Sequence, residues 1–252
     1  MRVALLSDIH GNLTALEAIL ADMRSQAPFD QFVVAGDLVW AGPRPAEVVD
    51  AVQALNAAVI QGNTDAFFRR GTGDAPPGKR DDRFATHLDW MQTKLGPARA
   101  AFLADLPFAH RIDPAPDQTL LVVHANPRDQ ERAILPRMNQ AQLDDLLAET
   151  GDWAALAFGH LHVPFTAHWH DRLLIDVASA GLPMDGDRRA AYAVLTWDGA
   201  GWQAEHRRVF YPLPVVANEM RTCGMPRGKH FAERLMNATY GPAGLDGRVA
   251  MD

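Results

Sequence analysis

The chain has 252 residues, of which 48% are apolar, enough to build the core of one soluble domain. Its formal net charge of −7 argues against a long nucleic acid as partner, because such binding requires many phosphates to be neutralised. No segment approaches the roughly 18 apolar residues of a membrane span, and the apolar run at the N-terminus is too short for a signal peptide. The single cysteine, Cys223, cannot form an internal disulfide. We therefore expect a cytoplasmic protein without a membrane partner.

Short apolar runs alternate with helical patterns in the first half of the chain, which is typical of βα units and parallel sheet. Thr14 and Glu17 fit a capping box at the start of the first helix. Glycine and proline mark residues 71–80 as a loop. The expected elements are strands at 3–7, 32–35 and 58–60, and helices at 13–23, 46–56, 84–95 and 98–103.

The pattern changes after the middle of the chain. A strand, a helix and a strand are expected at 120–123, 140–148 and 155–158, and consecutive strands at 165–169, 173–177, 191–197 and 202–210. Asp198-Gly199 is a hairpin signal between the last two strands. We predict one α/β domain with a parallel half and an antiparallel half, arranged as two packed sheets with helices outside.

Five segments each place polar side chains directly after an apolar strand. In open α/β sheets, ligands bind outside the carboxyl ends of strands, where loops from different strands converge. The five segments are Asp8-Ile9-His10, Gly36-Asp37, Gly62-Asn63-Thr64-Asp65, His124-Ala125-Asn126 and Gly159-His160-Leu161-His162. Their convergence predicts a metal centre.

The candidate ligands form a mixed oxygen and nitrogen set. They are Asp8, His10, Asp37, Asn63, His124, His160 and His162. Such a set suits Mn, Fe, Zn or Co, and it does not suit a soft thiolate site. Seven side chains exceed the needs of one tetrahedral ion but serve two divalent metal ions if one carboxylate bridges them. Manganese is the first expectation, with Fe, Zn, Ni, Co or Mg as alternatives.

The order DxH, GD, GN-x-D, H and GHxH resembles the calcineurin-like metallophosphoesterases. Residues 125–129 and 181–193 also resemble segments of small bacterial members of that family. The resemblance implies a four-layer αββα sandwich of two mixed sheets flanked by helices. It further implies a metallophosphoesterase domain over residues 1–212, followed by a C-terminal helical tail over 213–252 that is either part of the same domain or loosely packed.

The resemblance also assigns roles to the ligands. Asp8, His10, Asp37 and His162 would hold one ion, and Asp37, Asn63, His124 and His160 the other. Asp37, Asn63 and His124 are the expected catalytic residues, since Asp37 bridges the ions and the other two fix their geometry. A metal-bridging hydroxide would then attack the phosphate of a small phosphorylated substrate, such as a nucleotide.

Position 64 departs from the family pattern, which has GNHD where this chain has Gly62-Asn63-Thr64-Asp65. Threonine has no useful pKa near 7 and cannot replace a histidine as general acid. We therefore expect weak activity on alkyl monoesters. Thr64, Asn12 and Arg128 are the expected substrate-binding residues, although a helix cap explains Asn12 equally well and plain surface arginine explains Arg128.

The predicted activity is hydrolysis of a phosphodiester, nucleotide or phosphoanhydride. The alternatives are a phosphoprotein (Ser/Thr) phosphatase and a non-catalytic metal-binding scaffold of the same fold, which the presence of all seven ligands disfavours. A dinucleotide-binding protein would need G-x-G-x-x-G after its first strand, and a serine hydrolase G-x-S-x-G, and the chain has neither. The sequence leaves the oligomeric state open.

Overall fold

The computed structural model describes residues 1–70 and 82–240, which form two mixed five-stranded sheets flanked by helices. The first sheet has the order β10-β9-β1-β2-β3, and the second has the order β4-β5-β6-β8-β7. The strands are β1 (Arg2–Leu6), β2 (Gln31–Val34), β3 (Ala58–Val59), β4 (Ala109–Ile112), β5 (Leu120–Val123), β6 (Ala155–Phe158), β7 (Phe165–Trp169), β8 (Arg172–Asp176), β9 (Ala190–Trp197) and β10 (Trp202–Val209). The helices are α1 (Leu13–Gln26), α2 (Pro45–Ala54), α3 (Phe67–Arg70), α4 (Asp82–Ala104), α5 (Gln140–Leu147), α6 (Leu213–Thr222) and α7 (Gly228–Asn237).

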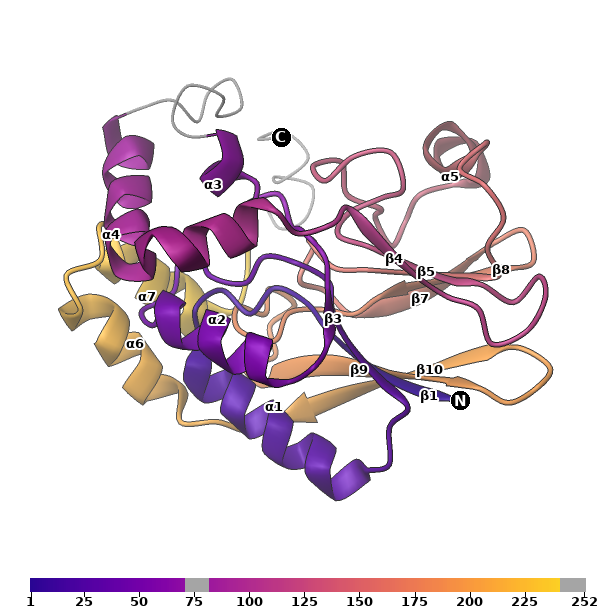
Figure 1. Cartoon of the computed structure of the whole chain (residues 1–252), viewed down its shortest axis with the longest axis horizontal. Coiled ribbons are helices and arrows are strands. Elements are labelled where there is room, and N and C mark those ends of the chain that lie inside the picture. The colour runs from indigo at the N-terminus through magenta and orange to yellow at the C-terminus, as the bar shows by residue number, and fades with distance from the viewer. Residues whose placement is uncertain (71–81, 241–252) are drawn as a thin grey trace.

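The layers follow from the alternation of side chains along the strands, which confirms the predicted αββα sandwich. On β1, Ala4 and Leu6 pack against the helical layer that includes α1, α2 and α4. Val3 and Leu5 face the other way and pack against strands of the second sheet. The far face of that sheet is covered by α5, which lies on the opposite side of the molecule from α1 (Figure 1). Because β1 is buried on both faces, its sequence is a continuous apolar run.

The predicted division into a parallel and an antiparallel half of the chain is wrong. β9 pairs antiparallel with β1 and so returns the late part of the chain to the first sheet. β8 pairs parallel with β6 and antiparallel with β7. Both sheets are therefore mixed, because strands from the second half complete each of them. Periodicity identifies strands, but it does not record which strand becomes the neighbour of which.

One cap differs from the expectation. Asn12, rather than Thr14, caps α1 by accepting the backbone N–H of Ala15 at 3.0 Å, so the predicted capping box is absent there. The two helices expected at 84–95 and 98–103 are both present within α4, where they meet at a kink at Gly96, whose φ is +68°. The sequence analysis missed α3 and β4. Of the four residues in β4 only Ile112 is buried, so its apolar signal is weak. The loop expected at 71–80 lies outside the described residues.

The C-terminal helices α6 and α7 contact each other and share a core with the rest of the molecule. Leu235 and Val216 are completely buried in that core beside Leu182 and Met184, which precede β9. Figure 1 shows both helices at the same end of the molecule as α1, α2 and α4. No helix among the described residues is long and apolar enough to cross a membrane.

We expect Leu235→Ala to destabilise the whole chain by about 2–5 kcal/mol, because it removes a fully buried side chain where tail and main core meet. Urea unfolding followed by circular dichroism measures this change. A loss of only about 0.5 kcal/mol would show that the tail is loosely packed and contributes little to the fold.

Candidate metal centre

The seven candidate ligands lie at one edge of the two sheets. Asp8 follows β1, Asp37 follows β2, and Asn63 lies beyond β3. The histidines come from the second sheet, except for His10 in the β1–α1 loop: His124 follows β5, and His160 and His162 follow β6. All seven residues are at most 6% exposed. The sheets pack face to face, so the carboxyl ends of their parallel strands converge on one site, as the sequence analysis expected.

Five of the seven ligands have a left-handed backbone. The φ angles of Asp8, His10 and Asp37 are +55°, +49° and +55°, and those of His160 and His162 are +67° and +60°. This conformation costs free energy in residues other than glycine and is concentrated at functional sites. Each loop turns sharply as it leaves its strand, and the turn directs the ligand side chain into the gap between the sheets.

Asp65 joins two of these loops. Its carboxylate accepts the backbone N–H groups of Asp37, Leu38 and Gly62 at 2.8, 3.0 and 3.0 Å. The loop after β2 is thereby fixed to the loop after β3. The sequence analysis noted Asp65 only as part of the GN-x-D motif and gave it no role. Its role depends on contacts between loops that the sequence does not show.

Asp8 makes the equivalent connection between the sheets. Its Oδ2 accepts the backbone N–H of His160 at 2.9 Å. Gly159 allows this approach, because a Cβ atom at that position would overlap the Asp8 carboxylate and the Ser7 hydroxyl. Burial opposes ionisation of Asp8, but the surrounding His162, His124 and His10 hold the pKa of its carboxyl well below the ordinary value.

Three imidazoles have their tautomer fixed by backbone carbonyl groups. The Nδ1 atoms of His10, His124 and His162 lie 2.7, 2.8 and 2.6 Å from the carbonyl oxygens of Trp40, Ala35 and Leu182. A carbonyl oxygen only accepts, so each Nδ1 carries the proton and donates it. In the neutral ring Nε2 is then an unprotonated acceptor, which is the arrangement of most metal-bound histidines. Burial and the neighbouring His162 lower the pKa of His10 to about 4, which keeps that ring neutral near pH 7.

The ligands form two groups, and in the first group, made of Asp8, His10 and His162, the acceptor atoms face each other. His10 Nε2 lies 3.1 Å from His162 Nε2, and His162 Nε2 lies 3.0 Å from Asp8 Oδ1. Asp8 Oδ1 is buried and accepts no hydrogen bond from the described residues. Side chains of Asp8, His10 and His162 have ligand atoms within 4.8 Å of one another.

The second group consists of Asp37, Asn63, His124 and His160, and its acceptor atoms also face each other. Asn63 Oδ1 lies 3.1 Å from His124 Nε2, and 3.3 Å from His160 Nδ1 and from each carboxylate oxygen of Asp37. The Nδ2 of Asn63 points away and donates to Glu131 at 3.3 Å. Turning the amide around would bring its donor to these atoms, but would place Oδ1 against the Glu131 carboxylate. A cation among the acceptors explains the inward oxygen.

The two groups are joined by the carboxylates. Asp37 Oδ2 lies 3.8 Å from His10 Nε2, and Asp37 Oδ1 lies 3.5 Å from His124 Nε2. Asp8 also belongs to both close sets of ligand atoms, one with His10 and His162 and one with Asp37 and His124. Converging lone pairs repel unless cations lie between them, so the residues fit divalent metal ions.

Two of the three predicted substrate-binding residues are used elsewhere. Asn12 is completely buried, and its side chain caps α1 and donates to the Gly181 carbonyl at 2.9 Å. The Arg128 guanidinium donates to the carbonyls of Leu146 and Ala148 at the C-terminal end of α5. Its charge thus stabilises a helix terminus, and a phosphate-binding role for Arg128 stays a prediction.

Thr64 remains beside the ligands. Its backbone N–H donates to Asp37 Oδ1 at 3.0 Å, and its buried Oγ1 forms no hydrogen bond within the described residues. A cavity of about 440 Å³ lies over the ligands and is bounded by Thr64, by Trp40, and by Arg227, Phe231 and Arg234 from the C-terminal tail. The sequence analysis missed these last three, because nothing in the order of the chain places residue 227 near residue 64.

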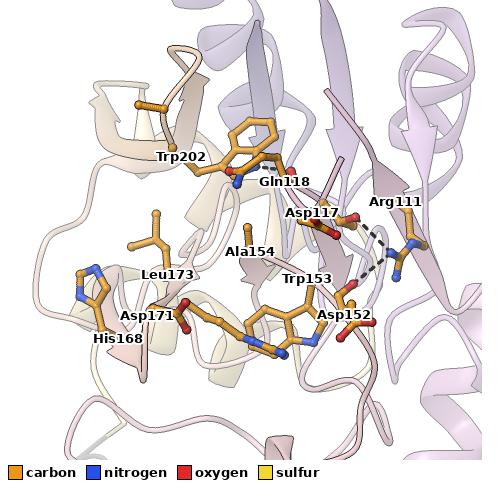
Figure 2. Close-up of a pocket in the computed structure, with 14 residues that line it drawn as sticks. Arg111, Asp117, Gln118, Asp152, Trp153, Ala154, His168, Asp171, Leu173 and Trp202 are labelled. Carbon is orange, nitrogen blue, oxygen red and sulfur yellow. Dashed lines mark hydrogen bonds between the residues drawn. The ribbon is translucent and has the colours of Figure 1, made fainter. Parts of the chain in front are cut away.

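A larger pocket of about 650 Å³ lies at the opposite edge, among residues that precede or begin β5, β6 and β8 (Figure 2). It contains none of the candidate ligands. The Trp202 Nε1 donates to the Gln118 carbonyl at 2.8 Å, and Arg111 donates to the Asp152 carbonyl at 3.1 Å. These donors stabilise the loops at the amino ends of the strands, away from the metal centre.

The model of one protein family matches residues 1–164 and is described as calcineurin-like phosphoesterase. This match covers more than half of the chain and spans all seven ligands. The chain belongs to the calcineurin-like phosphoesterase family.

The chain is also similar along most of its length to other proteins. A metallophosphoesterase structure from Sphaerobacter thermophilus has 28% identity and a TM-score of 0.73, covering 95% of this chain and 99% of that chain. A hypothetical protein from Pyrococcus horikoshii OT3 has 21% identity and a TM-score of 0.81, covering 94% and 98%. An uncharacterized protein from Methanocaldococcus jannaschii has 27% identity, covering 84% of this chain and 88% of that protein.

Asp37→Asn should abolish stable metal binding, because it halves the acceptor capacity and removes the charge between the two ligand groups. Loss of a residue that merely supports a ligand costs about 10–100-fold in affinity or activity, so we expect a larger loss here. Elemental analysis after gel filtration measures bound metal. Asp171→Asn, in the pocket at the opposite edge, is the matched control. Unchanged metal content in Asp37→Asn would exclude Asp37 as a shared ligand.

Proposed function

We propose that the chain is a phosphoesterase that uses two divalent metal ions to hydrolyse a small phosphodiester, nucleotide or phosphoanhydride. The observation that carries this proposal is the inward-facing set of acceptor atoms from Asp8, His10, Asp37, Asn63, His124, His160 and His162. Family membership supports a phosphoester as substrate, and the oxygen and nitrogen donors favour manganese or a similar ion.

Some residues of the site would supply negative charge, and others would fix the positions of the metal ligands. Divalent ions in such a centre supply Lewis-acid activation of water and neutralise charge on the phosphoryl group. Asp8 and Asp37 supply the negative charge that retains them. The carbonyl groups behind His10, His124 and His162 keep each Nε2 available and aimed, and Asp65 holds the loops in register.

Thr64 would make the reaction depend on the leaving group. Thr64 lines the cavity beside Asp37 and Asn63, and its hydroxyl does not protonate a departing alkoxide at neutral pH. Substrates whose leaving groups depart without a proton are therefore favoured. Activated diesters and anhydrides meet this condition better than alkyl monoesters.

We expect the purified protein to retain up to two metal ions per chain and to hydrolyse diesters and anhydrides with added Mn²⁺. Elemental analysis combined with a panel of phosphomonoesters, phosphodiesters and nucleoside polyphosphates tests this directly. Chelation should abolish activity, and Mn²⁺ should restore it. Full activity in the fully chelated protein would contradict the proposal.

Thr64→His should raise the rate selectively for substrates with poor leaving groups. Positioned acid catalysis is worth about 10²–10⁴-fold, so alkyl esters should gain in that range and nitrophenyl esters should change little. The measurement is a rate series across leaving-group pKa. Thr64→Asn, which fills space without a titratable group, is the control. Equal slopes for wild type and Thr64→His would show that this position does not affect proton transfer.

A further inference from the structure

The cavity over the metal ligands has two chemically different walls. One consists of the ligands themselves, including Asp37, Asn63 and His160, with Thr64 beside them. The other wall comes from the C-terminal tail and carries Arg227, Phe231 and Arg234. Among the described residues that line this cavity, the two arginines are the only lysine or arginine side chains. Any phosphate drawn to the metal centre would enter between these walls.

The tail residues lie at the start of α7 and on one of its faces. Arg227 is the N-cap residue that precedes the helix and has a left-handed backbone, with a φ of +60°. Phe231 and Arg234 lie within the helix three positions apart, so they project from the same side. Phe231 is 7% exposed and packs in the core of the tail, which fixes the rotation of the helix about its axis. The Arg227 guanidinium lies over the Phe231 ring, 5.5 Å from its centroid. The N-cap and the Phe231 face of α7 therefore present both arginines to the cavity.

The charge on Arg227 is not balanced by an acidic partner. Within the described residues Arg227 forms no ion pair, whereas Arg99 and Arg189 pair with Asp50 and Asp187 at 2.7 and 2.6 Å. Arg227 also acts on its surroundings, since after burial its charge contributes to lowering the pKa of His87, which reaches about 4. An unbalanced guanidinium at a cavity over a metal centre is suited to bind phosphate oxygens.

A second cavity of about 320 Å³ adjoins the first. The two share Trp40, Asn63 and Thr64, and also the tail residues Arg227, Phe231 and Arg234. Beyond them the second cavity is bordered by rings: the Trp40 ring lies 5.3 Å from that of Phe84 and 5.1 Å from that of Phe67. Phe84 and Trp40 are half-buried, so part of each ring is accessible. Aromatic surface next to guanidinium groups is the combination that binds a base together with its phosphate.

We propose that Arg227 at the N-cap of α7, together with Phe231 and Arg234 on the helix, forms the substrate-binding half of the active site, and that the substrate is a nucleotide. Arg227 and Arg234 bind the phosphoryl oxygens, and the nucleobase packs against the rings of Trp40 and Phe84. This inference rests on the proposed phosphoesterase function and names its substrate class.

The role of Arg227 and Arg234 is tested by measuring the affinity for inorganic phosphate, which requires no catalytic turnover. Isothermal titration of the Mn²⁺-loaded protein with inorganic phosphate should show dissociation constants raised about 10- to 100-fold in Arg227→Gln and in Arg234→Gln, the range for a hydrogen bond to a charged group. Arg227→Lys should fall between wild type and Arg227→Gln, because it keeps the charge but loses the planar fork. Metal content should stay at the wild-type value.

Lys229→Gln is the matched control, since Lys229 lies on α7, is exposed and borders neither cavity. Phosphate binding changed less than about twofold in the double variant Arg227→Gln/Arg234→Gln, with metal retained, would overturn the role of α7. A wild-type protein that hydrolyses nothing but binds phosphate through these arginines would contradict the proposed function, and only the role of the two arginines in phosphate binding would stand.

The proposed contact between the nucleobase and the rings is tested by comparing AMP with ribose 5-phosphate in the same titration. Stacking of one base is worth about 5- to 100-fold in affinity, so AMP should bind more tightly by that factor. Phe84→Leu should reduce the ratio and leave the affinity for ribose 5-phosphate unchanged. Equal affinities for the two compounds in the wild type would overturn the assignment of a nucleotide as substrate.

Discussion

The structure depends on acceptor atoms that are held close together inside the protein. The Nε2 atoms of His10 and His162 are 3.1 Å apart, and Asn63 Oδ1 faces His124 and the Asp37 carboxylate at 3.1 and 3.3 Å. Such an arrangement is unfavourable in isolation, because buried lone pairs repel and lack hydrogen-bond donors. Divalent cations reverse this balance, so binding of metal and stability of the folded state are linked.

The packing of the rest of the fold offsets the unfavourable free energy of this arrangement. β1 is buried on both faces, and its pairing with β2 and β9 fixes the point where each loop departs. Left-handed residues such as Asp8 and His160 turn the chain there, and the three backbone N–H groups bound by Asp65 hold neighbouring loops together. The strain of these turns is offset by the cores on either side of the sheets.

The candidate metal ligands and the proposed substrate-binding residues lie in different parts of the chain. The candidate ligands lie within the first 164 residues, which the family model also covers, whereas Arg227 and Arg234 belong to the C-terminal tail. A scaffold that holds metals is compatible with many phosphoesters, so selection among them has to come from the walls around it. In this chain α7 forms one of those walls, and its position is fixed by the packing of Leu235 and Phe231.

The sequence by itself determined the ligand set and the layers. Asp8, Asp37 and His124 follow apolar strands, and the parallel strands of one sheet must end at a common edge, so convergence followed from the order of the chain. Tertiary structure decided the rest. It returned β9 to the side of β1, assigned Asn12 and Arg128 to helix termini, and placed Arg227 opposite Thr64. Local patterns record burial and period, but contacts between distant segments depend on how complete surfaces pack, which no short stretch of sequence contains.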